Sequence, residues 1–417
     1  MKIVKTTGAG KRAAYALLEK IEQRGVVSTA RVGPVVRKIM DDVRRNGDRA
    51  LLKYAKKFDA LSVPIAVTQK EMAAAWNATA PEIQNALKTA AQNIQLFAEA
   101  QLPEDFILEP AKGVRTGQII RPLDSVGCYV PGGRYPLPST LLMTTIPAQV
   151  AGVPRIVVTS PRPARETLAA AHLAGITEFY RTGGAQAIAA LAYGTETISA
   201  VSKIVGPGNL YVTAAKIIAS AVCGIDMHAG PTEIVVTSEN GNAVLIASDL
   251  VAQAEHDPET LAVFITSNAA LAKQVLAEAK KQARVNPIAK QSLAARGIIF
   301  LTANADEAHS ITNRLAPEHL TVDSTADIAW VRNAGSVFIG PFSAQSLGDY
   351  VSGPNHVLPT GRAGRMRGGL SVLDFVKIIT VQQYTASGLK QLGPHAIALA
   401  EAEGLKAHAE SVRIRLS

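Results

Sequence analysis

Three apolar segments, each followed by a glycine-rich turn and a helical pattern, constrain the fold of this chain more than any other feature of its sequence. They are residues 126–130 before Pro131-Gly132-Gly133, residues 177–180 before Gly183-Gly184, and residues 201–205 before Gly206-Pro207-Gly208. Parallel strands need a crossover between them, usually a helix, so these units predict a parallel α/β sheet of the doubly wound type. A glycine-rich turn between a strand and a helix is also a common place for anion binding.

The same alternation predicts a second α/β half downstream. Its expected strands are 233–237, 261–266, 297–301, 321–323 and 336–339, and its expected helices are 243–255, 269–284 and 306–315. Apolar residues at helical spacing also predict helices over 13–22, 31–47 with an extension to 58, 69–101 and 139–151, the last with Ser139 as N-cap. We expect residues 102–120 to be irregular and two helices to follow residue 363.

The composition excludes several classes of function. The net charge of +9 would suit an anionic partner, but the basic residues are scattered and only 5% of residues are aromatic. Nucleic-acid binding is therefore not expected, because single strands need aromatic stacking platforms. No apolar run approaches the roughly 18 residues of a membrane span, and residues 1–12 lack the apolar region of a signal peptide. Two cysteines, Cys128 and Cys223, cannot build a disulfide framework, so we expect a cytoplasmic protein without a membrane partner.

The segment 315–320, Leu-Ala-Pro-Glu-His-Leu, offers acid–base chemistry. It places Glu318 directly before His319. Reference pKa values of about 4.3 and 6.5 give one site both a carboxylate and a near-neutral proton carrier. Pro317 disfavours the helical conformation for Ala316, so an element is expected to end or begin there. An isolated Glu-His pair is more often a solvated helix end, so the rest of the chain has to support a catalytic role.

Further nitrogen and oxygen donors recur along the second half of the chain. Gln253 and His256 are three residues apart near the end of an expected helix and share one face. The segment 348–356 contains Asp349 and His356, and the last expected helices carry Glu403 and His408. Such donors suit a zinc site that the substrate completes. Spacing alone does not show that these donors converge.

Ordered motifs along almost the whole chain resemble those of the histidinol dehydrogenase family. They lie at residues 129–133, 206–209, 225–227, 229–233, 247–256, 315–320, 348–360, 369–372 and 403–408. Any one of them could arise by chance, but the collinear set is specific.

The resemblance implies oxidation of L-histidinol through L-histidinal to L-histidine, the last step of histidine biosynthesis. Two NAD+ would each accept a hydride, and one Zn²⁺ per subunit would position the substrate. The implied architecture has two incomplete Rossmann-like doubly wound domains with small helical N- and C-terminal segments, in a homodimer whose active sites are shared between subunits. We assign an N-terminal helical arm to 1–22, a first domain to 23–125 and 236–362, an NAD-binding domain to 126–235, and a segment reaching the partner to 363–417.

The resemblance also implies roles for individual residues. The zinc ligands would be Gln253, His256, Asp349 and His408. Thr232, His319, His356 and Glu403 would contact substrate together with those ligands, and Tyr129, Gln186 and Asn209 would contact NAD. Glu318 would activate water and His319 would carry protons. Neither cysteine belongs to the matched site, so a thioester route is not expected.

Three departures from the family pattern leave the substrate open. His228 stands where Pro is usual, Gln345 stands where many members carry Glu, and the turn over 134–138 is bulkier than the common form. A lost carboxylate removes a charge near a cationic substrate. One alternative is therefore a paralogue that oxidises another small polar alcohol. A non-catalytic dinucleotide sensor is a second alternative, and the intact Glu318–His319 pair argues against it.

Overall fold

The structure is a computed structural model, and it describes residues 1–25, 31–132, 135–228 and 230–417. Parts of two predicted motifs, Gly133 with Arg134 and Ala229, lie outside the described residues.

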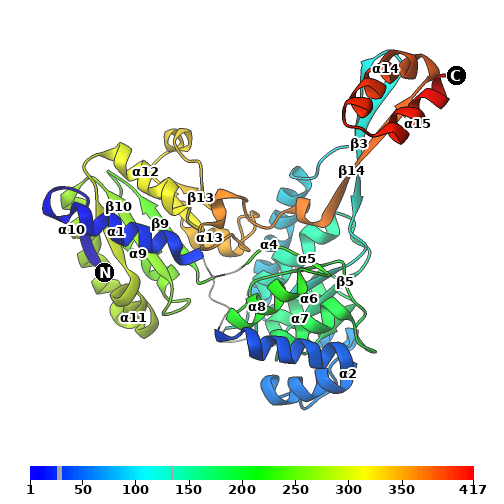
Figure 1. Cartoon of the computed structure of the whole chain (residues 1–417). Coiled ribbons are helices and arrows are strands. Elements are labelled where there is room, and N and C mark those ends of the chain that lie inside the picture. The colour runs from blue at the N-terminus through cyan, green and yellow to red at the C-terminus, as the bar shows by residue number, and fades with distance from the viewer. Residues whose placement is uncertain (26–30, 133–134, 229) are drawn as a thin grey trace.

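Two parallel sheets form the cores of two lobes (Figure 1). The first sheet has the order β1 (Lys2–Lys5), β11 (Ile298–Leu301), β10 (Leu261–Thr266), β9 (Glu233–Thr237), β12 (His319–Val322) and β13 (Ser336–Ile339). The second has the order β6 (Glu178–Tyr180), β5 (Ile156–Thr159), β4 (Val126–Tyr129), β7 (Lys203–Val205) and β8 (Gly224–Ile225). All neighbouring strands in both sheets are parallel. The predicted doubly wound α/β fold is confirmed.

Helices cover both faces of the first sheet, because alternate side chains of its buried strands point to opposite faces. Phe264 of β10 belongs to the core under α9 (Ala243–Ala254), α10 (Ala269–Gln282) and α11 (Pro287–Arg296). Its neighbours Val263 and Ile265 pack with α1 (Lys11–Glu22) and α12 (Ala305–Leu315). The N-terminal arm is therefore more than a helix, since β1 is the edge strand of this sheet.

The second sheet is covered by helices from a wider range of the chain than predicted. On one face lie α2 (Gly33–Asp59), α7 (Gly184–Tyr193) and α8 (Leu210–Ala219), and on the other lie α3 (Gln69–Asn77), α4 (Pro81–Ala100), α5 (Pro138–Val150) and α6 (Arg165–Leu173). Residues 23–125 were assigned to the first domain, but their helices bury Val36, Leu51 and Leu87 against the second sheet instead.

Local details correct other expectations. Pro81 starts a new helix and divides the predicted 69–101 helix into α3 and α4. Helix α5 begins at Pro138, so Ser139 is not its N-cap. Residues 102–120 are not irregular: they form β2 (Phe106–Ala111) and β3 (Val114–Pro122), which pair antiparallel with β14 (Val376–Tyr384). Proline and glycine in this stretch led to the expectation of an irregular segment. Instead β2 and β3 form a hairpin, and β3 pairs with β14, which lies about 260 residues later in the chain.

The C-terminal segment stands away from both lobes (Figure 1). The β3–β14 ribbon leads out to α14 (Ala386–Ala402) and α15 (Lys406–Leu416), which pack on each other. Within the described parts of the chain, no helix has both the length and the apolar character needed to cross a membrane.

Candidate active site

The Glu318–His319 pair lies at the start of β12, between β9 and β13. Helix α12 ends at Leu315, and Ala316 takes a left-handed conformation with φ 45° before Pro317, as the sequence predicted for an element end. The Ser336 amide then donates to the Glu318 carbonyl over 2.9 Å, and His319 pairs in register with Ser336 and Ile234. Both side chains are buried, with 6% and 3% exposed. The alternative interpretation of this pair, a solvated helix end, is thereby excluded.

A directed chain of hydrogen bonds ends on the Glu318 carboxylate. Gln345 Nε2 donates to Gln253 Oε1 over 2.6 Å, and Gln253 Nε2 donates to Thr232 Oγ1. Thr232 Oγ1 donates to Glu318 Oε2 over 2.5 Å, and the Glu233 amide donates to the same oxygen over 2.7 Å. Three residues that the sequence placed in separate motifs, Thr232, Gln253 and Glu318, therefore belong to one network.

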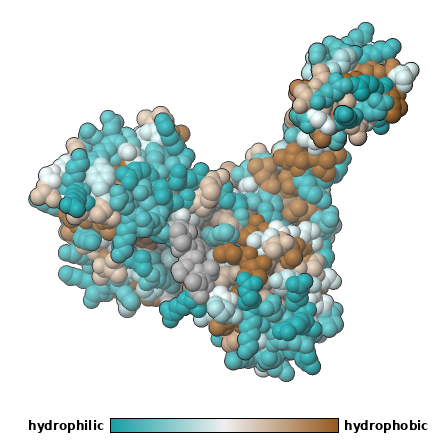
Figure 2. Space-filling model, in the orientation of Figure 1, coloured by the Kyte–Doolittle hydropathy of each residue, from teal (hydrophilic) through white to brown (hydrophobic). Residues whose placement is uncertain are grey.

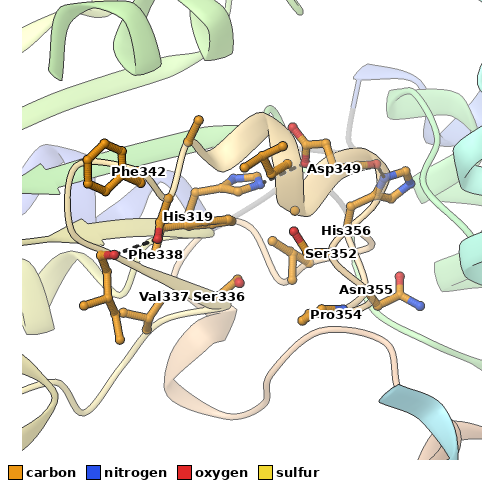
Figure 3. A pocket seen from close by; sticks show the side chains of 16 residues that line it. His319, Ser336, Val337, Phe338, Phe342, Asp349, Ser352, Pro354, Asn355 and His356 are labelled. Atoms are coloured by element: carbon orange, nitrogen blue, oxygen red, sulfur yellow. Dashed lines mark hydrogen bonds and ion pairs between the residues drawn. The ribbon is translucent and has the colours of Figure 1, made fainter. Parts of the chain in front are cut away.

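The His319 ring lies between the carboxylates of Glu318 and Asp349, and Figure 3 shows its Asp349 side. Its Nδ1 is 3.1 Å from the Glu233 carbonyl oxygen and 3.6 Å from Glu318 Oε2, and its Nε2 is 3.4 Å from Asp349 Oδ1. A carbonyl oxygen only accepts, so Nδ1 carries the proton in the neutral ring and Nε2 is the basic atom. Burial alone would lower the pKa of His319, but Glu318 and Asp349 outweigh it and raise the pKa to about 10.

Helix α13 (Gln345–Tyr350) and the loop after it bring Asp349 and His356 to the same cavity. His356 Nδ1 is 2.7 Å from the Asp349 carbonyl oxygen, and its Nε2 is 3.0 Å from Thr140 Oγ1 at the start of α5. Burial would raise the pKa of Asp349, but His319 and other imidazoles lower it. The cavity of about 320 Å³ is lined by His319, Asp349, Ser352, Asn355 and His356, among others (Figure 3).

The four predicted zinc ligands are only partly brought together within one chain. Gln253 accepts a hydrogen bond from Gln345 of α13, the helix that also carries Asp349. The charge of His256 lowers the pKa of Asp349. Gln253, His256 and Asp349 therefore lie near one another. His408 on α15 and Glu403 at the end of α14 lie in the projecting segment, away from α9 and α13 (Figure 1). Within the described ranges, no group of three or more His, Cys, Asp or Glu side chains could hold a metal ion.

The three predicted NAD contacts line one cavity of about 560 Å³ in the other lobe. Tyr129 ends β4, Gln186 lies in the first turn of α7, and Asn209 caps α8 by accepting from the Tyr211 and Val212 amides. The Gly184 amide donates to Tyr129 Oη over 3.2 Å. The cavity therefore lies beyond the carboxyl ends of β4, β6 and β7, where doubly wound sheets bind dinucleotides.

Several residues of the site were not predicted as such. Glu233 forms a two-point ion pair with Arg24, and its own carbonyl and amide groups hold His319 and Glu318. Thr140 contacts His356, and Asp59 lines the cavity formed by Tyr129, Gln186 and Asn209. Gln345 had been noted only as a departure from the family. No sequence pattern links Arg24 or Asp59 to residues more than 100 positions away.

Comparisons with known proteins agree on one family. The family model described as Histidinol dehydrogenase matches residues 22–416. A histidinol dehydrogenase of Rhizobium meliloti (strain 1021) is 49% identical over 93% of this chain and 92% of its own length. One from Methanothermobacter thermautotrophicus is 46% identical over 92% and 93%. The crystal structure of histidinol dehydrogenase from Elizabethkingia anophelis superposes with a TM-score of 0.94 at 36% identity, covering 100% of this chain and 98% of that chain.

Proposed function

Because this chain belongs to the histidinol dehydrogenase family, it is an oxidoreductase of histidine biosynthesis, and we propose that it oxidises L-histidinol to L-histidine at the Glu318–His319 pair. The observation that carries this assignment of residues is the buried His319 ring, with one nitrogen on the Glu233 carbonyl and the other facing Asp349 beside a cavity. A ring oriented in this way can exchange protons at Nε2. In the metal-free site the two carboxylates raise its pKa to about 10 and keep it protonated near neutral pH, so we propose that it becomes a base once a bound cation offsets the charge of Asp349.

The proposed steps use the two residues in different roles. His319 Nε2 accepts the hydroxyl proton of histidinol while a hydride leaves its carbinol carbon, which gives the aldehyde. Glu318 then accepts a proton from the water that adds to the aldehyde carbon, and His319 returns its proton to the former carbonyl oxygen, which gives the hydrate. His319 accepts the proton of the resulting hydrate as the second hydride leaves, and the carboxyl group of histidine is formed. NAD+, when bound, supplies the hydride acceptor for both oxidations.

A Zn²⁺ ion fits the donor chemistry beside this pair. His256 and Asp349 offer an imidazole and a carboxylate, which are common ligand types for zinc, and Gln253 adds an amide oxygen, which is an unusual one. We propose that they hold the ion together with His408 of a second copy of the chain, and that the ion fixes the imidazole and amine of the substrate. Thr232, His356 and Glu403 would complete the substrate contacts.

The need for a second copy is supported by the projecting segment. His408 cannot complete a site near α9 of its own chain while α15 stands apart (Figure 1). The ribbon at the base of the segment also exposes Phe106, Ile107 and Leu108 on β2 and Ile378 and Ile379 on β14. Figure 2 shows hydrophobic surface where the projecting segment meets the lobe. Such an uncovered apolar patch is typical of a protein–protein interface, so we propose a homodimer with shared active sites.

Stoichiometry tests the proposed reaction. Purified protein with Zn²⁺, NAD+ and limiting L-histidinol should release two NADH per histidinol and accumulate histidine, measured by absorbance at 340 nm and by chromatography. One NADH per substrate would remove the second oxidation from the proposal. If histidinol gives no NADH but another small polar alcohol is oxidised, that alcohol is the substrate and the proposed substrate is wrong.

A further inference from the structure

The NAD cavity contains a carboxylate that the proposed contacts do not use. Asp59 is the last residue of α2 and is only 7% exposed, and it lines the cavity with Tyr129, Gln186 and Asn209. Its Oδ2 accepts from the Gly183 amide and from Gln186 Nε2, each over 3.0 Å. The end of α2 is thus fixed to the turn that follows β6.

The second oxygen of this carboxylate is free to accept from a ligand. No described residue donates to Asp59 Oδ1. Beside it, Val35, Ile39 and Phe58 form an apolar wall of the same cavity, and Val35 and Phe58 are about half exposed. A free acceptor next to an apolar wall matches the two halves of a nucleoside, a sugar that donates hydrogen bonds and a flat apolar base.

The chain lacks a carboxylate where doubly wound dinucleotide sites usually have one. That residue follows the second strand of the unit, about 20 residues after the glycine-rich turn, and binds the ribose hydroxyls. Here β5 is followed by Ser160, Pro161 and Arg162, and none of them is acidic. Asp59 reaches the cavity from α2 instead, so the same chemical group comes from a different element.

We propose that Asp59 Oδ1 accepts hydrogen bonds from the adenosine ribose of the dinucleotide and makes the cavity selective for NAD+ over NADP+. The inference rests on the proposed function, because it takes this cavity to be the dinucleotide site. A carboxylate binds the 2′-hydroxyl and repels a phosphate at that position. Arg162, the other charged residue of the lining, is exposed. Its charge is therefore screened by water more than that of the buried carboxylate.

The variant that tests this is Asp59→Asn. Asn keeps one oxygen for Gly183 and Gln186 but puts an NH₂ group where Oδ1 faced the cavity. Titration calorimetry with ADP should show binding to the unaltered protein and at least about tenfold weaker binding to Asp59→Asn, as expected for a lost hydrogen bond to a charged group. Asp41→Asn is the matched control, because Asp41 is exposed on the same helix, does not line the cavity, and should leave ADP affinity unchanged.

A second measurement uses only the unaltered protein and holds even if the variant fails to fold. Adenosine 2′,5′-bisphosphate and 2′-deoxy-ADP should each bind at least about tenfold more weakly than ADP. Equal affinities for the three nucleotides, or unchanged ADP binding by a folded Asp59→Asn, would overturn the role of Asp59 and leave the cavity as the dinucleotide site. If neither ADP nor NAD+ binds the unaltered protein, the assignment of the cavity itself fails, and the inference fails with it.

Discussion

At the scale of single residues, the environment of His319 sets the expected chemistry. Its Nε2 faces Asp349 and its Nδ1 faces a carbonyl oxygen, so one atom is available for proton transfer. We predict that His319→Asn lowers turnover of histidinol by about two orders of magnitude or more, within the range for a lost general base. Steady-state NADH formation measures this. A rate near that of the unaltered protein would remove His319 from the mechanism.

Glu318 is expected to act in one step more than in the other. Its carboxylate accepts from Thr232 and Glu233 and lies beside His319, where it can activate water. We predict that Glu318→Gln slows oxidation of added L-histidinal more than oxidation of histidinol to the aldehyde. Single-turnover measurements with each substrate separate the two steps. Equal slowing of both would count against the assignment of Glu318 as the base for hydration.

The two cysteines give a prediction that depends on pH. Burial raises the pKa of Cys128 to about 12 and that of Cys223 to about 11, so both stay neutral thiols at pH 8. At a pKa of about 11, roughly one thiol in a thousand is ionised at that pH, and only the thiolate reacts. Iodoacetamide at pH 8 should therefore leave dehydrogenase activity intact until the protein is unfolded. Rapid inactivation of the folded enzyme would reopen the thioester route.

How far the sequence could predict the site depended on how local each signal was. Glu318 and His319 are adjacent, so their shared site could be predicted, and Gln253, Asp349 and Thr232 followed from the family motifs. Asp59 and Arg24 could not, because their importance comes only from contacts with Gly183 and Glu233, far away in the chain. Such contacts are decided by tertiary packing, which leaves no periodic pattern in the sequence.

At the scale of elements, helix α2 depends on the glycine at its interruption. Gly47 has φ 50° and ψ −134°, and a Cβ added there would meet the carboxylate of Glu196, which accepts from the Asp48 amide over 2.7 Å. We predict that Gly47→Ala lowers the free energy of unfolding by about 1–3 kcal/mol, the cost of holding an L-residue in a sparsely populated positive-φ conformation. Denaturant unfolding measures it.

The same helix supplies the control for that variant. Gly33 begins α2 with ordinary helical geometry, and a Cβ added there meets no atom within 4 Å. Pro34 follows Gly33, and a proline ring disfavours helical geometry in a preceding residue that has a Cβ, so Gly33→Ala should be mildly destabilising and less so than Gly47→Ala. If the two alanine variants are equally stable, the interruption at Gly47 carries no strain and the prediction is wrong.

Strands with both faces buried were predicted well from the sequence, and strands with exposed faces were predicted poorly. The strands β9 and β10 are buried throughout and read as continuous apolar runs. The expected strand over 321–323 began too late, because His319 is a polar residue at the buried start of β12. The strands β2 and β14 were missed because most of their side chains are exposed and follow no alternation that the sequence reveals.

At the scale of the whole molecule, the proposed sharing of sites can be tested by mixing. His256→Ala and His408→Ala should each lose zinc and activity. If the site combines His256 of one copy with His408 of another, random reassociation makes half of the dimers mixed, and each mixed dimer has one intact site. About a quarter of normal activity and zinc content should return, as measured by turnover and metal analysis. If verified mixed dimers recover neither zinc nor activity, the two histidines do not form one site across the subunit interface. They would then belong to different sites, or to one site within a single chain.

The overall architecture was predictable, but the grouping of its parts was not. The order of strands, turns and helices predicts a doubly wound fold. The sequence of residues 1–5 and 33–59 does not show which of the two similar sheets these segments join. The structure places β1 beside β11 and α2 against α7 and α8. These choices follow from the shapes of complementary apolar faces.

The pairing of β1 with β11 also bears on how the chain is made in a cell. Lys2 lies opposite Ile298, so the edge strand waits for a partner that is translated much later. At about 5–20 residues per second, the delay is on the order of 15–60 s. Residues 31–228, which supply most of the second lobe, leave the ribosome during that interval, while the first few residues are still unpaired and open to chaperones. The core of that lobe also includes Val357, Val372 and Phe375, which emerge later still.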